Sequence, residues 1–295
     1  MAREKKLREP MDLKKEARLL PGYLLCTAWI LFTFVVVAWV VFASTLTSGE
    51  IFSETMIQSF FQRLGSFTLK LDNYVKAWNT QKVSVYFLNS LLYTVISCTL
   101  IIIVAAPAAY VLSRFRFPGN NFIQSLIATA LGIPAIMIII PLFSVFTSLK
   151  MTNTRPTIIF LYIAMNVPFA IFFLLTFFKN LSFTFEEAAA MDGSGPIGTF
   201  WRIMFPLAQP GVITGTVFNF ITIWNEYFMS MIFANKTAVR PVAVGLYNMI
   251  QSMRYTGDWG GMFASVVIVF APTFVLYLFL SEKIIAGVTG GAIKG

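Results

Sequence analysis

The sequence predicts an all-α polytopic membrane protein with six transmembrane helices, on the strength of its composition and its long apolar stretches. Of its 295 residues, 57% are hydrophobic and 12% are charged. Soluble domains carry about 25% charged residues, so this chain has too few charges to cover a water-facing surface of its size. A surface that faces hydrocarbon removes this requirement.

Six stretches have the length that a membrane-spanning helix needs, about 20 mostly apolar residues. They are residues 22–44, 87–112, 122–147, 157–178, 211–234 and 262–281. A transmembrane barrel would show alternating strands of about ten residues, and these continuous runs are too long for that. Gly211 and Gly215, four positions apart, fit a small-residue motif for close helix packing.

Basic residues near the ends of the spans set the expected orientation. The N-terminal tail carries the densest group, Arg3, Lys5, Lys6, Arg8, Lys14, Lys15 and Arg18. An apolar run follows this tail directly, which favours a cytoplasmic retention signal over an arm that binds nucleic acid. We expect both termini in the cytoplasm, with segments 45–86 and 235–261 outside.

These features divide the chain into four parts. Residues 1–21 form a basic cytoplasmic tail, and residues 22–86 hold the first transmembrane helix and an outer segment. Residues 87–286 form a core of five transmembrane helices with a cytoplasmic loop at 182–206, and residues 287–295 form a C-terminal tail.

Prolines and one acid inside the spans suggest a polar pathway. The prolines are Pro107, Pro134, Pro141, Pro168 and Pro272. Each frees a backbone carbonyl, which in a membrane must be satisfied by protein or water. Glu226 is the one ionisable residue within the predicted spans. It either faces a pathway or reaches water at the outer end of its span, and the prolines either border a pathway or fit neighbouring helices.

The sequence lacks the residues that several kinds of chemistry require. Histidine is absent, which excludes His-based catalysis and His-ligated zinc. Cys26 and Cys98 both lie in apolar stretches and are expected to be small buried hydrophobes. The chain has no Gly-x-x-x-x-Gly-Lys-Ser/Thr phosphate loop. We therefore expect a non-catalytic chain with no metal and no cofactor of its own.

The cytoplasmic loop predicts two short helices joined by a sharp turn. Residues 186–191 are strong helix formers with two acids first, where the helix dipole favours them. Gly193 is the expected helix stop, Ser194 an N-cap, and Pro196 the first turn of a second helix that Pro206 limits. The second helix has an apolar face that should dock on another surface. Its residues are Phe200, Trp201, Ile203 and Phe205.

This loop resembles the EAA motif of binding-protein-dependent permeases, the membrane subunits of bacterial type I ABC importers. The matching residues are Glu187-Ala188-Ala189, Asp192-Gly193-Ser194 and Ile203-Met204-Phe205-Pro206. The chain departs from the family pattern at Ser194, where the family has Ala, and at Phe205, where it has Leu. Other segments resemble the carbohydrate-uptake branch and its maltose-type permease. They are Asn89-Ser90-Leu91, Ala108-Ala109-Tyr110, Ser113-Arg114-Phe115, Trp224-Asn225-Glu226 and the glycine-rich ending 287–295.

The resemblance implies a type I importer permease in the bacterial inner membrane, acting on a sugar or oligosaccharide. It implies four partners: a second permease, two ATPase subunits that bind ATP and Mg²⁺, and an extracytoplasmic solute-binding protein. The loop would couple to an ATPase through Glu186, Glu187, Ala188, Ala189, Asp192, Gly193, Ile203 and Pro206. The C-terminal tail would reach between the two ATPases through Gly290, Gly291 and Lys294.

The same resemblance gives two further groups of candidates. Asn166, Asn219, Asn225, Glu226 and Tyr227 are candidates for the substrate path. In the outer segment, Tyr255 and Trp259 offer stacking surfaces and Gly257, Gly260 and Gly261 flexibility, for contact with the binding protein. That segment could instead pack on the partner permease.

Three rival functions remain open at this point. An ion-coupled secondary transporter would need more acids in the membrane than Glu226. A membrane enzyme would need clustered acids, histidines or an activated nucleophile, none of which is evident. A glycerol phosphate or polyol importer would use the same machinery, but an anionic substrate favours Arg or Lys inside the path. The predicted spans contain neither, which favours a neutral saccharide.

Overall fold

The protein is built from helices of very different lengths. The computed structural model describes residues 13–54, 56, 58, 61 and 71–290, with backbone only at 13–17, 254 and 282–290. The long helices are α1 (Leu13–Ala43), α5 (Val83–Arg114), α8 (Arg155–Asn180) and α15 (Trp259–Gly290). The shorter ones are α2 (Ser48–Ile51), α4 (Asp72–Asn79), α6 (Asn120–Leu131), α7 (Ala135–Ser148), α9 (Thr184–Met191), α10 (Pro196–Thr199), the π-helical η1 (Phe200–Met204), α11 (Phe205–Leu207), α12 (Gln209–Trp224), α13 (Phe228–Phe233), the 3₁₀ η2 (Thr237–Val239) and α14 (Val242–Thr256).

Four of the six predicted spans are single helices. Within the described residues, α1, α5, α8 and α15 are long and apolar enough to cross a membrane, and α6 with α7 forms a bent pair that would make a fifth span. The predicted single helix at 122–147 is therefore wrong, because α6 and α7 meet at an angle of 97°. Gly132 ends α6, and Pro134 takes an extended conformation and begins α7. Proline disfavours a helical conformation in the residue before it but fits a helix start.

The predicted span at 211–234 is also discontinuous. Helix α12 ends at Trp224, and α13 begins at Phe228. Segments 45–86 and 235–261 were expected to lie outside, and both contain helices. The first begins with a capping box in which Thr47 and Glu50 satisfy each other's backbone N–H groups, and the second holds the 15-residue α14.

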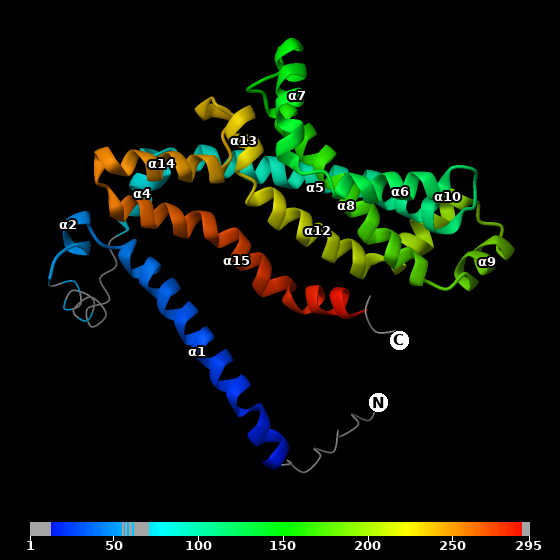
Figure 1. The fold of residues 1–295 in the computed structure, drawn as a ribbon, viewed down its shortest axis with the longest axis horizontal. Helices are drawn as coiled ribbons and strands as arrows, with labels where there is room; N and C mark the ends of the chain where they lie inside the picture. The colour runs from blue at the N-terminus through cyan, green and yellow to red at the C-terminus, as the bar shows by residue number, and fades with distance from the viewer. Residues whose placement is uncertain (1–12, 55, 57, 59–60, 62–70, 291–295) are drawn as a thin grey trace.

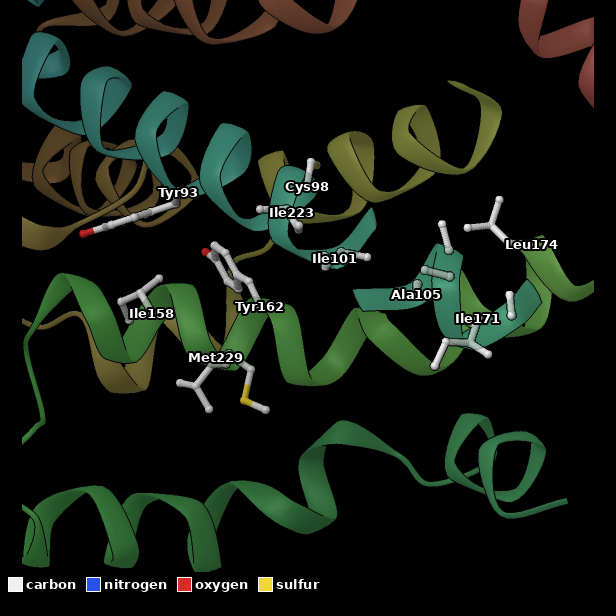
Figure 2. Close-up of a cluster of buried hydrophobic side chains, with 14 of the residues drawn as sticks. Tyr93, Cys98, Ile101, Ala105, Ile158, Tyr162, Ile171, Leu174, Ile223 and Met229 are labelled. Atoms are coloured by element: carbon white, nitrogen blue, oxygen red, sulfur yellow. The ribbon is translucent and has the colours of Figure 1, made fainter. Parts of the chain in front are cut away.

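Helices α5 and α8 run side by side and form the centre of the core. Figure 2 shows Tyr93, Ile101 and Ala105 of α5 facing Tyr162 and Leu174 of α8. The rings of Tyr93 and Tyr162 meet edge to face with centroids 6.3 Å apart. Helix α12 packs on α5, α8 and α15, whereas α1 contacts α15 and diverges from the rest (Figure 1). The most apolar 18-residue stretch of α1 has no buried residue, and Cys26 on α1 is exposed, contrary to expectation, whereas Cys98 on α5 is buried as expected.

The expected close packing at Gly211 and Gly215 is confirmed. A β-carbon on Gly211 would overlap the ring of Phe177 on α8, and one on Gly215 would lie 3.2 Å from the ring of Phe173. The missing side chains let α12 approach α8 closely.

We predict that Gly211→Ala destabilises the protein by about 1–3 kcal/mol, because the added methyl group overpacks the α8–α12 contact. Thermal unfolding in detergent measures this, and Phe177→Leu should restore part of the loss. Gly22→Ala in α1, where a β-carbon meets nothing within 4 Å, is the matched control. An unchanged or raised melting temperature for Gly211→Ala would contradict the close contact.

Candidate functional site: the loop after α8 and the broken span

The loop after α8 folds as two short helices with a sharp turn, as predicted. It lies at one end of the molecule, and α2, α4 and α14 lie at the other (Figure 1). Gly193 stops α9 with a φ of 77°, and its N–H donates to the Ala190 carbonyl at 3.0 Å. A positive φ of this size favours glycine. Ser194 as N-cap is wrong: Gly195 is the N-cap of α10, and the Ser194 hydroxyl accepts a bond from Thr199 at 3.2 Å.

The apolar side of the second helix packs on the protein's own core. Phe200 and Met204 are buried, and the Phe200 ring lies 5.1 Å from that of Tyr110 on α5. The prediction that this face docks on a surface is therefore met in part by the chain's own core, where Phe200 packs. The burial of Phe200 among aromatic rings anchors the loop to the hydrophobic core, and Ile203 is partly buried against the same core. Trp201 and Pro206 remain exposed.

The outward surface of the loop carries two apolar residues that the sequence analysis missed. Met191 is 85% exposed and Ile197 is 78% exposed. They flank the turn, next to Glu187, Ala188 and Asp192, which are also exposed. Their positions on either side of Gly193 could have predicted this exposure. An isolated apolar residue at the edge of a tight turn has no core nearby to pack against.

The two acids of α9 have different surroundings. Glu186 forms an ion pair with Arg114 at the end of α5, with Oε1 and Nε 3.2 Å apart. The Arg114 side chain is 3% exposed. It also donates from Nη2 to the Leu181 carbonyl at 2.7 Å, and its guanidinium lies over the Phe183 ring at 4.2 Å. Glu186 is thus already paired within the chain, and Glu187 is the acid that is exposed.

The break between α12 and α13 is organised by Glu226. Its carboxylate accepts hydrogen bonds from the backbone N–H of Met229 at 2.7 Å and of Ser230 at 3.0 Å, and from the Ser230 hydroxyl at 2.7 Å. Ser230 in turn bonds to Tyr162 on α8 at 2.6 Å. The acid therefore satisfies backbone donors that the break would leave unpaired. The sequence analysis considered a pathway or water contact but not this capping role.

The other candidates for the substrate path fall into two groups. Asn166 and Asn225 each donate to the carbonyl four residues earlier in their own helix, both at 2.8 Å. The Tyr227 ring lies 5.0 Å from that of Tyr247 on α14. Asn219 differs from these, because it is buried and neither amide atom has a hydrogen-bond partner among the described residues.

Two hydroxyls on α5 share this property and were missed by the sequence analysis. Thr94 and Ser97 are buried, and their side-chain oxygens also lack partners within the described part of the chain. Helix α5 packs against α12, which carries Asn219. Unpaired polar groups are costly in an apolar interior, and all three of these side chains are buried within this chain.

In segment 235–261, the residues expected to contact the binding protein have very different surroundings. Tyr255 is 91% exposed, and Gly257 ends α14 with a φ of 60°. The Trp259 N–H donates to Ser48 at 3.0 Å. Gly260 and Gly261 are buried, and a β-carbon on Gly260 would collide with the Leu46 carbonyl and the Asn73 amide. The expected flexibility at Gly260 and Gly261 is therefore wrong, because these glycines permit close packing.

At the C-terminus, α15 extends to Gly290. The start of the predicted tail, residues 287–290, is therefore helical. Gly291 and Lys294 lie outside the described residues. Among the residues searched, no group of three His, Cys, Asp or Glu side chains is placed to hold a metal ion.

Comparison with known proteins shows the family to which the chain belongs. The family described as "Binding-protein-dependent transport system inner membrane component" matches residues 99–285. The chain belongs to this family. The matched region includes the α9–α10 loop and the break at Glu226.

Relatives of this permease are similar over most of its length. The diacetylchitobiose uptake system permease protein NgcG of Streptomyces coelicolor is 32% identical, over 76% of this chain and 74% of that protein. The probable ABC transporter permease protein YurM of Bacillus subtilis is 34% identical over the same shares. A solved bacterial ABC transporter involved in import of the acidic polysaccharide alginate has the same fold, with a TM-score of 0.75, 21% identity, and coverage of 93% of this chain and 99% of that one.

We predict that Arg114→Ala destabilises the permease by about 3–5 kcal/mol, because Glu186 is left buried and unpaired. The double variant Arg114→Leu with Glu186→Leu should lose much less. Melting temperature and the rate of limited proteolysis within residues 181–195 measure the effect. Arg202→Ala, which removes an exposed arginine, is the control. Equal losses in the single and double variants would show that the pair does not hold the loop.

We also predict that Glu226→Ala destabilises the protein by about 0.5–2 kcal/mol, the usual effect of losing a helix cap. Melting temperature measures this, with Asn225→Ala as control, since Asn225 donates only within its own helix. A Glu226→Ala variant of unchanged stability that cannot transport would contradict the capping role and favour direct substrate contact.

Proposed function

We propose that this permease imports a neutral saccharide delivered by a solute-binding protein. It would pair with a second permease around a shared path and be driven by two ATPase subunits. The observation that carries the proposal is the α9–α10 loop. Its apolar side is anchored in the core by Phe200 and Met204, while Glu187, Met191 and Ile197 present an exposed surface with no cover from this chain.

The saccharide class is supported by the relatives and by charge. Besides diacetylchitobiose, the printed names of similar permeases include trehalose, for SugB of Mycobacterium tuberculosis at 29% identity. The predicted spans hold no Arg or Lys with which an anionic substrate could pair. A glycerol phosphate or polyol importer using the same machinery is the alternative.

The loop suits a coupling element that seats in a cleft of an ATPase. Met191 and Ile197 would supply apolar contact, and Glu187 a charge-assisted contact with a basic ATPase residue. Movement of the ATPase would pass to the membrane helices by two connections. One is the Arg114 ion pair and hydrogen bond to α5, and the other is the packing of Phe200 against Tyr110 and Phe178.

Because both connections end on the paired helices α5 and α8, the loop would move these helices as one body. This is the behaviour expected of alternating access, in which rigid bundles rock around a central site. Asn225, which is exposed, and Tyr227, which is partly exposed, are the first candidates to face that site, whereas Asn219, Thr94 and Ser97 are buried within this chain. Tyr255 is the first candidate for contact with the binding protein.

We expect this permease to co-purify with a second permease and an ATPase in a ratio of one to one to two. Tagged protein, isolated in mild detergent from cells that express the adjacent genes, tests this by quantitative mass spectrometry. An active transporter consisting of this chain alone would contradict the proposal.

A second test addresses the loop directly. Glu187→Lys combined with Gly193→Asp should abolish ATPase co-purification and uptake while membrane insertion stays normal. Reversal of the exposed charge breaks the ionic contact, and the positive φ of Gly193 disfavours any side chain. Glu54→Lys reverses an exposed charge far from the loop and should have no effect. Retained uptake in the loop variant would count against the coupling role.

A further inference from the structure

A polar cavity of about 610 Å³ lies beside the loop, and nothing above assigns it a role. It is formed by the end of α5, the turn at 115–119, the start of α6 and the end of α8. Its lining includes three cations and three amides, and no Asp or Glu. They are Arg114, Arg116, Lys179, Asn120, Asn121 and Gln124. This lining fits an anion.

The cations differ in how far they are already neutralised. Arg114 pairs with Glu186, but its Nη1 has no hydrogen-bond partner among the described residues. Arg116 and Lys179 are exposed, and neither forms an ion pair within that part of the chain. Lys179 Nζ donates to the Gln124 side chain at 3.2 Å, which holds it at the cavity. The cavity therefore keeps an excess of positive charge.

An apolar groove of about 330 Å³ continues from this cavity between α6 and α8. The two spaces share Gln124 and Lys179. Beyond these residues the groove is lined mainly by apolar side chains, among them Ile127, Phe172 and Leu175. Phe172 is half exposed on the flank of a membrane-crossing helix. A ligand that fills both spaces needs an anionic head and an apolar chain.

We propose that this cavity and groove bind an anionic phospholipid of the cytoplasmic leaflet. The phosphate would lie between Arg116 and Lys179, and an acyl chain would run along Ile127, Phe172 and Leu175. The inference rests on the proposed orientation, which puts the loop and the ends of α5 and α8 on the cytoplasmic side. Anionic lipids are enriched at that surface and attract basic residues near the membrane.

The groove decides between a lipid and other anions. A soluble phosphate would leave the apolar groove unused, and an acidic segment of an ATPase would have to enter the hydrocarbon region to fill it. The lipid satisfies both spaces at once, because its headgroup and chain lie at the depths where the cations and the apolar side chains lie.

Native mass spectrometry of the intact transporter, purified with its ATPases, tests the proposal. The probe is phosphatidylglycerol, with phosphatidylcholine of the same chains as the comparison. The wild-type complex should retain phosphatidylglycerol selectively. Arg116→Gln with Lys179→Gln should weaken its binding roughly 30-fold, since each basic residue near a membrane contributes about a fivefold preference. Lys150→Gln with Lys236→Gln removes two exposed cations that do not line the cavity and should leave binding unchanged.

Three results would overturn the lipid site. The first is equal retention of both lipids by the wild-type complex, and the second is undiminished phosphatidylglycerol binding in the cavity variant. The third is displacement of the lipid by glycerol phosphate at equal concentration, because the acyl chain would then contribute nothing. In each case, recovery of the ATPases with the permease would show that the proposed coupling to ATPases still stands. Failure of the lipid site can therefore be told apart from failure of the proposed function.

Discussion

The buried guanidinium of Arg114 is the constraint on which the arrangement of this permease depends. A charge with so little access to water must be paired, and here its partners all belong to the segment that leads into the α9–α10 loop: the Leu181 carbonyl, the Phe183 ring and the Glu186 carboxylate. The end of α5 and the start of the loop are thereby fixed to each other. The loop is a rigid extension of the membrane core and not a tether.

The membrane-embedded part obeys a related constraint, because backbone groups without water must find partners inside the protein. Glu226 shows how this shapes the span that contains it. The helix breaks after Trp224, and the carboxylate supplies the acceptors for the first N–H groups of α13. The break at Gly132 and Pro134 has a different cause, a local conformational preference. The two breaks differ in their surroundings: Gly132, Ile133 and Pro134 are exposed in the single chain, whereas Met229 and Ser230, which follow the break at Glu226, are buried.

Much of this could be predicted from the sequence. Four spans followed from apolar length alone, and the two-helix loop followed from Gly193, whose conformation few other residues adopt. Several of the failures share a cause, since they depended on partners distant in the chain. The pairing of Glu186 with Arg114, the burial of Phe200 and the close approach of Gly260 to Asn73 are long-range contacts that no local pattern encodes. Apolar length likewise could not reveal the bend between α6 and α7.

We propose that the loop and α5 move together when ATP closes the ATPases. Distances between spin labels test this most directly, in a transporter whose Cys26 and Cys98 are replaced and which carries labels at Ala190 in the loop and Val95 on α5, both exposed and neither among the residues proposed to contact the ATPase. The account predicts a narrow distance distribution that stays the same with and without ATP, while the distance from Ala190 to a label on the proposed partner permease changes. An Ala190–Val95 distance that shifts or broadens on ATP binding would contradict rigid transmission through Arg114.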